Sequence, residues 1–89
     1  VMTLQGHSDT VFAATFSADG TRIVTGSGDD TAKVWDTKTG VEILTLNGHR
    51  DSVRAASLSA DGTRIVTACD DRTAKLWDAK TGAELLTLK

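Results

Sequence analysis

Residue types that could form a hydrolytic site occur twice along the chain. An imidazole, a hydroxyl and a carboxylate are the parts of a nucleophilic triad, and here a tryptophan accompanies them. The two sets are His7, Thr25, Asp29 and Trp35, and then His49, Thr67, Asp71 and Trp77. A catalytic centre is needed only once, whereas a structural device recurs in every copy of a repeat. We therefore expect both sets to be structural, and a hydrolase using them is the weaker alternative.

The recurrence extends along the whole chain at a period of 42 residues. The segments 17–25 and 59–67 are identical, and both read Ser-Ala-Asp-Gly-Thr-Arg-Ile-Val-Thr. Such self-similarity is typical of repeat architectures. The sequence of 89 residues therefore predicts two copies of one supersecondary unit, about 11–46 and about 53–88, rather than two domains.

Each copy predicts four short β-strands separated by turn residues. Glycine and aspartate occupy the turns, and the segments between them are rich in β-prone residues. The predicted strands are Val11–Ser17, Arg22–Ser27, Thr31–Asp36 and Glu42–Leu46, then Val53–Ser59, Arg64–Cys69, Thr73–Asp78 and Glu84–Leu88. No segment shows a sustained helical period. We expect an all-β chain with two four-stranded antiparallel sheets.

The apolar residues of the first strand predict a local irregularity. Val11, Ala14 and Phe16 share one face only if an extra residue interrupts the alternation, so we expect a β-bulge near residues 12–13. The adjacent pair Ile23-Val24 places apolar groups on both faces of the sheet. A sheet that is apolar on both sides needs cover from a sheet on each side.

Composition excludes several classes of protein. Ten basic and twelve acidic residues give a net charge of −2, which argues against a nucleic-acid surface. No apolar run reaches the ~20 residues of a membrane helix, and no signal peptide is visible. We expect a cytoplasmic protein. The single cysteine, Cys69, excludes an intrachain disulfide, and because it aligns with Ser27 we expect a small packed residue.

The other chemistry-bearing residues predict no metal and no cofactor. The pairs Asp29-Asp30 and Asp70-Asp71 lack the ligand spacing of a calcium loop. Asp36 and Asp78 end their strands, where they would fix the following turn. The lysines are scattered and balanced by carboxylates, which predicts a solvated surface. They are Lys33, Lys38, Lys75 and Lys80.

Three features at a fixed period together point to a family. They are Gly6-His7, the Phe16–Gly20 turn and Asp29–Asp36, which ends in Trp-Asp, and each has its copy. With them the chain resembles WD40 repeats over its whole length. The resemblance implies a β-propeller in which each four-stranded sheet is a blade around a central channel. It also implies that each His, Thr, Asp and Trp set forms a buried chain of hydrogen bonds from indole to hydroxyl, imidazole and carboxylate.

Two blades cannot close a ring, because propellers contain about 4–8. We expect head-to-tail homo-oligomers, with eight blades from four chains favoured over six from three. The ends add a complication, because Val1–Gln5 aligns with Leu85–Lys89. Both compete for one outermost strand, and Val1–Gln5 could complete a blade of a neighbouring chain. Which segment takes that place stays open.

The remaining signal lies where the two copies differ. Differences gather near the loop before the first strand and in the second turn, which in WD40 propellers share the end of the ring that receives peptides and proteins. The candidate face comprises Thr10, Phe12, Gly28, Ser52, Arg54 and Asp70, with Phe12 and Arg54 as anchors. Free variation of exposed loops explains the differences equally well.

The sequence therefore favours a non-enzymatic WD40 scaffold that assembles with itself. In a parent protein such blades would be a platform for proteins or peptides. The alternative is a designed or excised propeller fragment without a natural partner, which the start at Val1 instead of methionine suits. An enzyme is the weakest of the three hypotheses.

Overall fold

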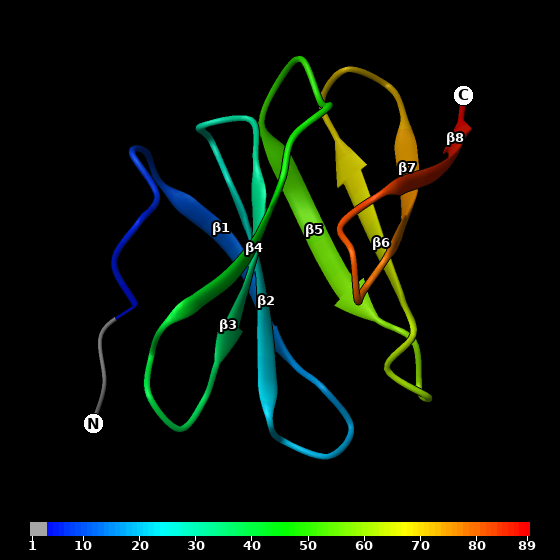
Figure 1. Ribbon diagram of the computed structural model, residues 1–89. Coiled ribbons are helices and arrows are strands. Elements are labelled where there is room, and N and C mark those ends of the chain that lie inside the picture. The colour runs from blue at the N-terminus through cyan, green and yellow to red at the C-terminus, as the bar shows by residue number, and fades with distance from the viewer. Residues whose placement is uncertain (1–3) are drawn as a thin grey trace.

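The computed structural model describes residues 4–89 and contains two four-stranded antiparallel sheets (Figure 1). In each sheet the strands lie in chain order. Blade 1 consists of β1 (Val11–Phe16), β2 (Arg22–Ser27), β3 (Ala32–Asp36) and β4 (Glu42–Leu46). Blade 2 consists of β5 (Val53–Leu58), β6 (Arg64–Cys69), β7 (Ala74–Asp78) and β8 (Glu84–Leu88). The predicted fold class, all-β with two such sheets, is confirmed.

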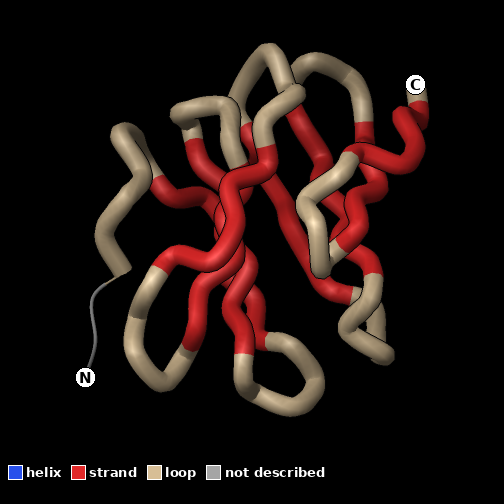
Figure 2. The backbone as a smooth tube through the Cα atoms, viewed as in Figure 1, coloured by secondary structure: helices blue, strands red, loops and turns tan. Residues whose placement is uncertain are grey.

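Strands and loops make up the whole of residues 4–89 (Figure 2). Within this range no helix has the length and apolarity of a membrane span. Four strands are one residue shorter than predicted, because a hydroxyl residue at one end belongs to the turn. Ser17 is an example, since its side-chain oxygen accepts a hydrogen bond from the Arg22 N–H at 3.0 Å and closes the β1–β2 turn.

The bulge expected in the first strand is present in both blades. The register shifts between Val11 and Ala13 in β1 and between Val53 and Ala55 in β5. A second irregularity was not predicted. It lies between β3 and β4, where Trp35 pairs with Glu42 and Val34 pairs with Leu44. The same shift recurs in blade 2.

The carboxylates that end β3 and β7 organise the turns after them, as predicted. Asp36 Oδ1 accepts hydrogen bonds from the N–H groups of Lys38 and Thr39, at 2.7 and 3.1 Å. Asp78 makes the equivalent bonds in blade 2. Gly40 follows with a φ of 74°, in the left-handed region that glycine adopts at least cost.

The blades pack face to face, with β5 against β1 and β2 (Figure 1). The apolar core lies at this interface and contains Val24, Ala32, Val34, Leu46, Val53, Ala56, Ile65 and Trp77. The approach is closest at Gly26, where an added Cβ would lie 2.9 Å from the carbonyl oxygen of Val53. Thr15 Oγ1 also donates a hydrogen bond across the interface to the Ala56 carbonyl, at 2.8 Å.

The apolar face predicted for the first strand is covered in only one blade. Val53 and Ala56 of β5 are buried against blade 1. Their counterparts Val11 and Ala14 are exposed, as is Phe16. The sequence predicted cover on both sides of each sheet. Because the chain supplies a single blade–blade interface, only one face of each blade is covered by another blade.

The prediction that the four lysines are solvated is wrong for two of them. Lys33 and Lys75 are buried, and their ammonium groups contact the carboxylates of Glu42 and Glu84. Lys33 Nζ also donates to Thr45 Oγ1 at 2.9 Å. The alternation of the strands, which turns both lysine stems toward the side that carries the tryptophan, explains this burial.

The outermost strand of blade 2 is β8 (Glu84–Leu88). Leu4 and Gln5 are not in a strand. The rest of the competing segment, residues 1–3, lies outside the described residues. In one copy of the chain, the C-terminal segment therefore takes the edge position.

Candidate functional site

The structure brings the four residues of the first set into one chain of hydrogen bonds. The indole N–H of Trp35 donates to Thr25 Oγ1 at 2.9 Å. Thr25 Oγ1 lies 2.6 Å from His7 Nε2, and His7 Nδ1 lies 2.8 Å from a carboxylate oxygen of Asp29. The loop before β1, strand β2, the β2–β3 turn and strand β3 are thereby connected through these side chains.

Blade 2 repeats this arrangement with one difference. Trp77 donates to Thr67 Oγ1 at 2.9 Å, and Thr67 Oγ1 lies 2.6 Å from His49 Nε2. The distance from His49 Nδ1 to Asp71 Oδ2 is 3.3 Å, longer than its counterpart in blade 1. The set is otherwise the same, down to the edge-on packing of imidazole against indole.

The indole fixes the direction of the first hydrogen bond. Trp77 has only a donor, so Thr67 Oγ1 accepts from it. With the ring proton on Nδ1, the imidazole of His49 donates to Asp71, and its Nε2 accepts from the Thr67 hydroxyl. Hydrogen bonding from Thr73 is the main cause that holds the pKa of Asp71 below its ordinary value, while burial opposes it.

In blade 1 the corresponding carboxylate is also held in its charged form. Burial raises the pKa of Asp29, but hydrogen bonds from Thr31, His7 and the Ser8 N–H together outweigh burial and lower the pKa. Among the described residues, no buried side-chain nitrogen or oxygen lacks a hydrogen-bond partner. Each network is therefore saturated within its own blade.

The arrangement contains the three groups of a triad but gives a substrate no access to them. Thr67, which would be the nucleophile, has an exposed fraction of 0%. Its oxygen is already engaged by Trp77 and His49. A nucleophile must reach the reacting carbon, and Thr67 is not placed to do so in this structure.

Cys69 lies beside the second network and adds the one set of candidate metal ligands among the described residues. Ligand atoms of His49, Cys69 and Asp71 lie within 4.8 Å of one another. All three are engaged in hydrogen bonds, and the thiol contacts the Asp51 carbonyl at 3.2 Å. Burial raises the pKa of the Cys69 thiol, which disfavours the thiolate that a metal would need. These residues do not fit a metal centre.

The candidate partner-binding face has a connected centre. The guanidinium of Arg54 lies over the ring of Phe12, 4.2 Å from its centroid, and its Nε donates to Asp70 Oδ2 at 2.9 Å. Gly28 aligns with Asp70 and leaves room for the Phe12 ring. A Cβ added at Gly28 would lie 3.3 Å from the Cε2 atom of Phe12. The carbonyls of Thr10 and Ser52 accept hydrogen bonds from the second turn of their blades.

A separate apolar surface lies on the outer face of blade 2. We call it the second free face, and it comprises Val66, Leu76, Leu86 and Leu88. Val66 is 44% exposed and Leu88 is 53% exposed. Their counterparts Val24 and Leu46, at the interface between the blades, are 0% exposed.

The outer face of blade 1 has the same character. This first free face comprises Val11, Ala14 and Phe16. Val11 is 47% and Phe16 66% exposed, whereas Val53, the counterpart of Val11, is fully buried. The individual residues were readable as apolar from the sequence, but only the structure shows which copies remain uncovered.

Comparison with known proteins gives a consistent result. The family model for the WD40 repeat ("WD domain, G-beta repeat") matches residues 1–36 and 40–78. Vegetative incompatibility protein HET-E-1 of Podospora anserina is 53% identical over 38 residues, which are 43% of this chain and 3% of that protein. U3 small nucleolar RNA-associated protein 15 homolog of Xenopus tropicalis is also 53% identical over 38 residues, 43% of this chain and 7% of that protein.

Solved structures show the same fold. The crystal structure of the RRP9 WD40 repeats superposes with a TM-score of 0.91 at 20% identity, covering 97% of this chain and 28% of that one. The structure of U3-55K gives the same values. The chain thus spans only a small part of each of these relatives. Because the family model matches well over half of its residues, the chain belongs to the WD40 repeat family.

Proposed function

We propose that this chain is a non-enzymatic scaffold that builds a propeller ring by adding blades of its own kind to its two free faces. The WD40 family to which it belongs typically provides scaffolds for protein interactions. For the 89-residue chain, the blade that covers each free face would come from a second copy. Contacts of this type are head-to-tail and close if the rotation per chain divides a full turn.

The observation that carries the proposal is the correspondence between free and covered positions. The second free face repeats the surface of blade 1 that blade 2 covers, and Val66 and Leu88 stand where Val24 and Leu46 are buried. The first free face repeats the surface that blade 2 presents. Each end of the chain therefore carries the complement of the other end.

Burial of these faces supplies a driving force of useful size. Several hundred Å² of apolar surface at ~25 cal/mol per Å² corresponds to several kcal/mol before the entropy of association. Exposed apolar faces of that size otherwise favour aggregation. Four copies would make eight blades and three would make six, both within the range of about 4–8 that propellers adopt.

The contact between copies would not repeat the internal interface atom by atom. Ala68 stands on the second free face where blade 1 has Gly26, and Phe16 on the first free face where blade 2 has Leu58. Both residues are larger than their counterparts. The two sheets would therefore lie slightly farther apart at this seam, with Phe16 filling the space.

Native mass spectrometry and light scattering of the 89-residue chain test the proposal. We expect a closed oligomer for the wild type and a monomer for Leu86→Glu, which places a charge on the second free face. The control is Asn47→Glu, which adds the same charge at an exposed residue in the loop from β4 to β5. This variant should still assemble. A wild-type chain that is monomeric at micromolar concentration would disprove ring closure.

A protein contact on the loop face is supported by a separate observation, the exposed Phe12–Arg54–Asp70 cluster. Aromatic and arginine side chains are enriched in binding hot spots, and a symmetric ring would present several copies of the cluster and gain by multivalency. Affinity capture with the wild type and with the Phe12→Ser/Arg54→Ser variant, scored by mass spectrometry, tests this. Identical sets of captured proteins would contradict it.

A further inference from the structure

A groove of about 410 Å³ lies along the seam between the blades, lined by residues of one chain and separate from both networks. Its volume falls in the range of about 300–1,000 Å³ that ligand sites occupy. We propose that it binds a short peptide segment in which an acidic residue stands next to a branched apolar one. This inference does not depend on ring closure, because one copy of the chain supplies every lining residue.

The groove has an apolar floor that continues the core. Val34 is buried, and Leu58 and Ala79 pack against the core cluster at its edge. Ile43 of blade 1 forms the wall and keeps 41% of its surface exposed. The bulge between β3 and β4 leaves Ile43 out of the ladder. An apolar ligand side chain placed here would cover Ile43 without moving a strand.

Cationic side chains outnumber carboxylates in the lining of this groove. Arg22, Arg64 and Lys80 line the groove together with a single carboxylate, that of Asp78. Asp78 Oδ1 already accepts hydrogen bonds within its own turn, from the N–H groups of Lys80 and Thr81. Across residues 4–89, the side chains of Arg64 and Lys80 form no ion pair within 4.0 Å.

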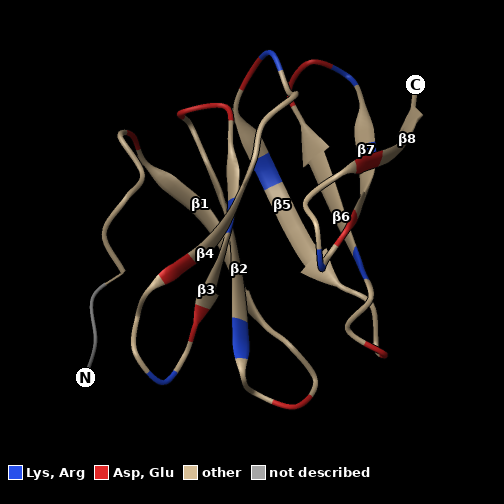
Figure 3. Ribbon diagram, viewed as in Figure 1, with Lys and Arg blue, Asp and Glu red and all other residues tan. Residues whose placement is uncertain are grey.

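This local excess of cations contrasts with the molecule as a whole, whose net charge is −2. Lys, Arg, Asp and Glu are interspersed over both blades (Figure 3). Arg22 does have a carboxylate nearby, but Asp36 lies 3.9 Å away at the edge of contact. Arg64 lies near two carboxylates, because its charge adds to the hydrogen bonds that lower the pKa of Asp61 and of Asp78. Lys80 is therefore the cation of the groove that is most available to an acidic ligand.

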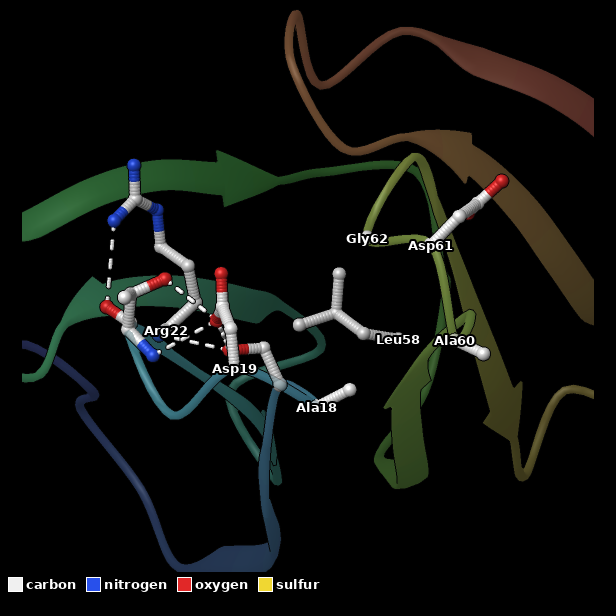
Figure 4. Close-up of a pocket in the computed structure, with 9 residues that line it drawn as sticks. Ala18, Asp19, Arg22, Leu58, Ala60, Asp61 and Gly62 are labelled. Carbon is white, nitrogen blue, oxygen red and sulfur yellow. Dashed lines mark hydrogen bonds between the residues drawn. The ribbon is translucent and has the colours of Figure 1, made fainter.

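The neighbouring cavity gives the ligand a direction. It has a volume of about 290 Å³ and shares Arg22, Leu58 and Gly62 with the groove. Figure 4 shows Leu58 between the two turns that carry Asp19 and Asp61. A hydrogen bond from the Thr21 N–H is the main cause that lowers the pKa of Asp19 to about 2, so this carboxylate is charged at neutral pH.

Asp61 is charged for the same kind of reason, with hydrogen bonding from Ser59 as the main cause that lowers its pKa to about 2. The two carboxylates beyond Leu58 repel an acidic group, whereas Lys80 in the lining of the groove attracts it. The arrangement orients a peptide with its acidic residue toward Lys80.

The same charges disfavour a nucleic acid. Phosphate backbones need a continuous run of cations, and here the run is short and ends at Asp19 and Asp61. The apolar floor of Val34, Ile43 and Leu58 offers nothing to a phosphate but suits an aliphatic side chain. The groove therefore fits a peptide better than a polyanion.

Fluorescence polarisation with labelled peptides tests the proposal. The probe is a short glycine–serine peptide with one isoleucine followed by two aspartates. Two matched peptides replace the isoleucine by serine or the aspartates by asparagine. We expect saturable binding of the probe to the 89-residue chain. Both matched peptides should bind more weakly, by about tenfold or more.

Two pairs of protein variants locate the site. Lys80→Glu should weaken binding about tenfold or more, whereas Arg50→Glu, the same charge reversal outside the groove, should not. Ile43→Ser should likewise weaken it, while Val41→Ser, at an exposed apolar residue outside the groove, should leave it unchanged. Tryptophan fluorescence verifies that each variant is folded.

Three outcomes would overturn the proposal. The first is no binding of the probe by folded wild-type chain. The second is equal binding of the serine and isoleucine peptides, which would mean charge attraction alone. The third is binding of a single-stranded oligonucleotide that competes with the probe and is lost in Lys80→Glu, which would identify a polyanion site.

Discussion

The guanidinium of Arg54 in blade 2 lies over the ring of Phe12 in blade 1, 4.2 Å from the ring centroid. These two residues occupy the same position in the two repeats, at the bulge of the first strand. The difference between the copies is therefore a contact between them, and it joins the blades at the loop end. Asp70 holds the guanidinium from the other side, at 2.9 Å from Nε.

The coupling between Phe12 and Arg54 is measurable by a double-mutant cycle. Phe12→Ala, Arg54→Ala and the double variant should show an interaction of about 0.5–1 kcal/mol in the free energy of unfolding, the size of a cation–π contact at an exposed site. Urea titration followed by tryptophan fluorescence measures it. The comparison Arg50→Ala with Phe12→Ala should show no coupling, and strictly additive effects of Phe12 and Arg54 would refute the contact.

Removal of an imidazole should weaken the fold through the groups that it leaves unpaired. His49→Ala deprives Thr67 and Asp71 of a partner, and we expect a loss of about 1–3 kcal/mol in the free energy of unfolding. Urea denaturation provides the value. His49→Gln, which keeps hydrogen-bonding capacity, should lose less. An unchanged midpoint in His49→Ala would show that the network contributes nothing to stability.

A single methyl group at Gly26 should separate the blades. An added Cβ would lie 2.9 Å from both the Cγ1 atom and the carbonyl oxygen of Val53, so Gly26→Ala should destabilise the chain by about 1–3 kcal/mol, as overpacking does. Ala68 is the matched position on the second free face. Ala68→Gly should cost about 1 kcal/mol or less, through chain entropy alone. Thermal unfolding of both variants distinguishes packing from backbone propensity.

Stability should fall at acidic pH because native carboxylates have lowered pKa values. The pKa of Asp61 falls from its ordinary value of 3.8 to about 2, mainly through hydrogen bonding from Ser59, and Asp19 shows the same shift, with the Thr21 N–H as its main cause. The native state thus binds fewer protons than the unfolded state between these values. The stabilisation is complete above pH 3.8 and is lost as the pH falls toward 2.

Urea titrations at a series of pH values from 5 to 2 measure this effect, and carboxyl NMR shifts of Asp61 give its pKa directly. The double variant Asp19→Asn/Asp61→Asn should have a shallower dependence on pH than the wild type. A wild-type curve that stays flat down to pH 2 would contradict the lowered pKa values.

Sequence alone predicted the elements of this protein because their signals are local and are repeated. The identical 17–25 and 59–67 segments indicated one unit twice, and the broken alternation at Val11, Ala14 and Phe16 indicated the bulge. Trp35 and Asp36 marked the end of a strand and the start of a turn in both the pattern and the structure. Local turn chemistry and side-chain alternation need no tertiary information.

Tertiary structure decided what the local pattern leaves open, namely which of two equivalent surfaces is covered. Val24 and Val66 are the same residue in the same repeat position, yet one is fully buried and the other is exposed, because only blade 1 has a neighbour on that side. The burial of Lys33 and the stacking of Arg54 on Phe12 likewise depend on neighbours distant along the chain. Packing between sheets depends on both sheets of a pair, so the sequence of a single repeat does not determine it.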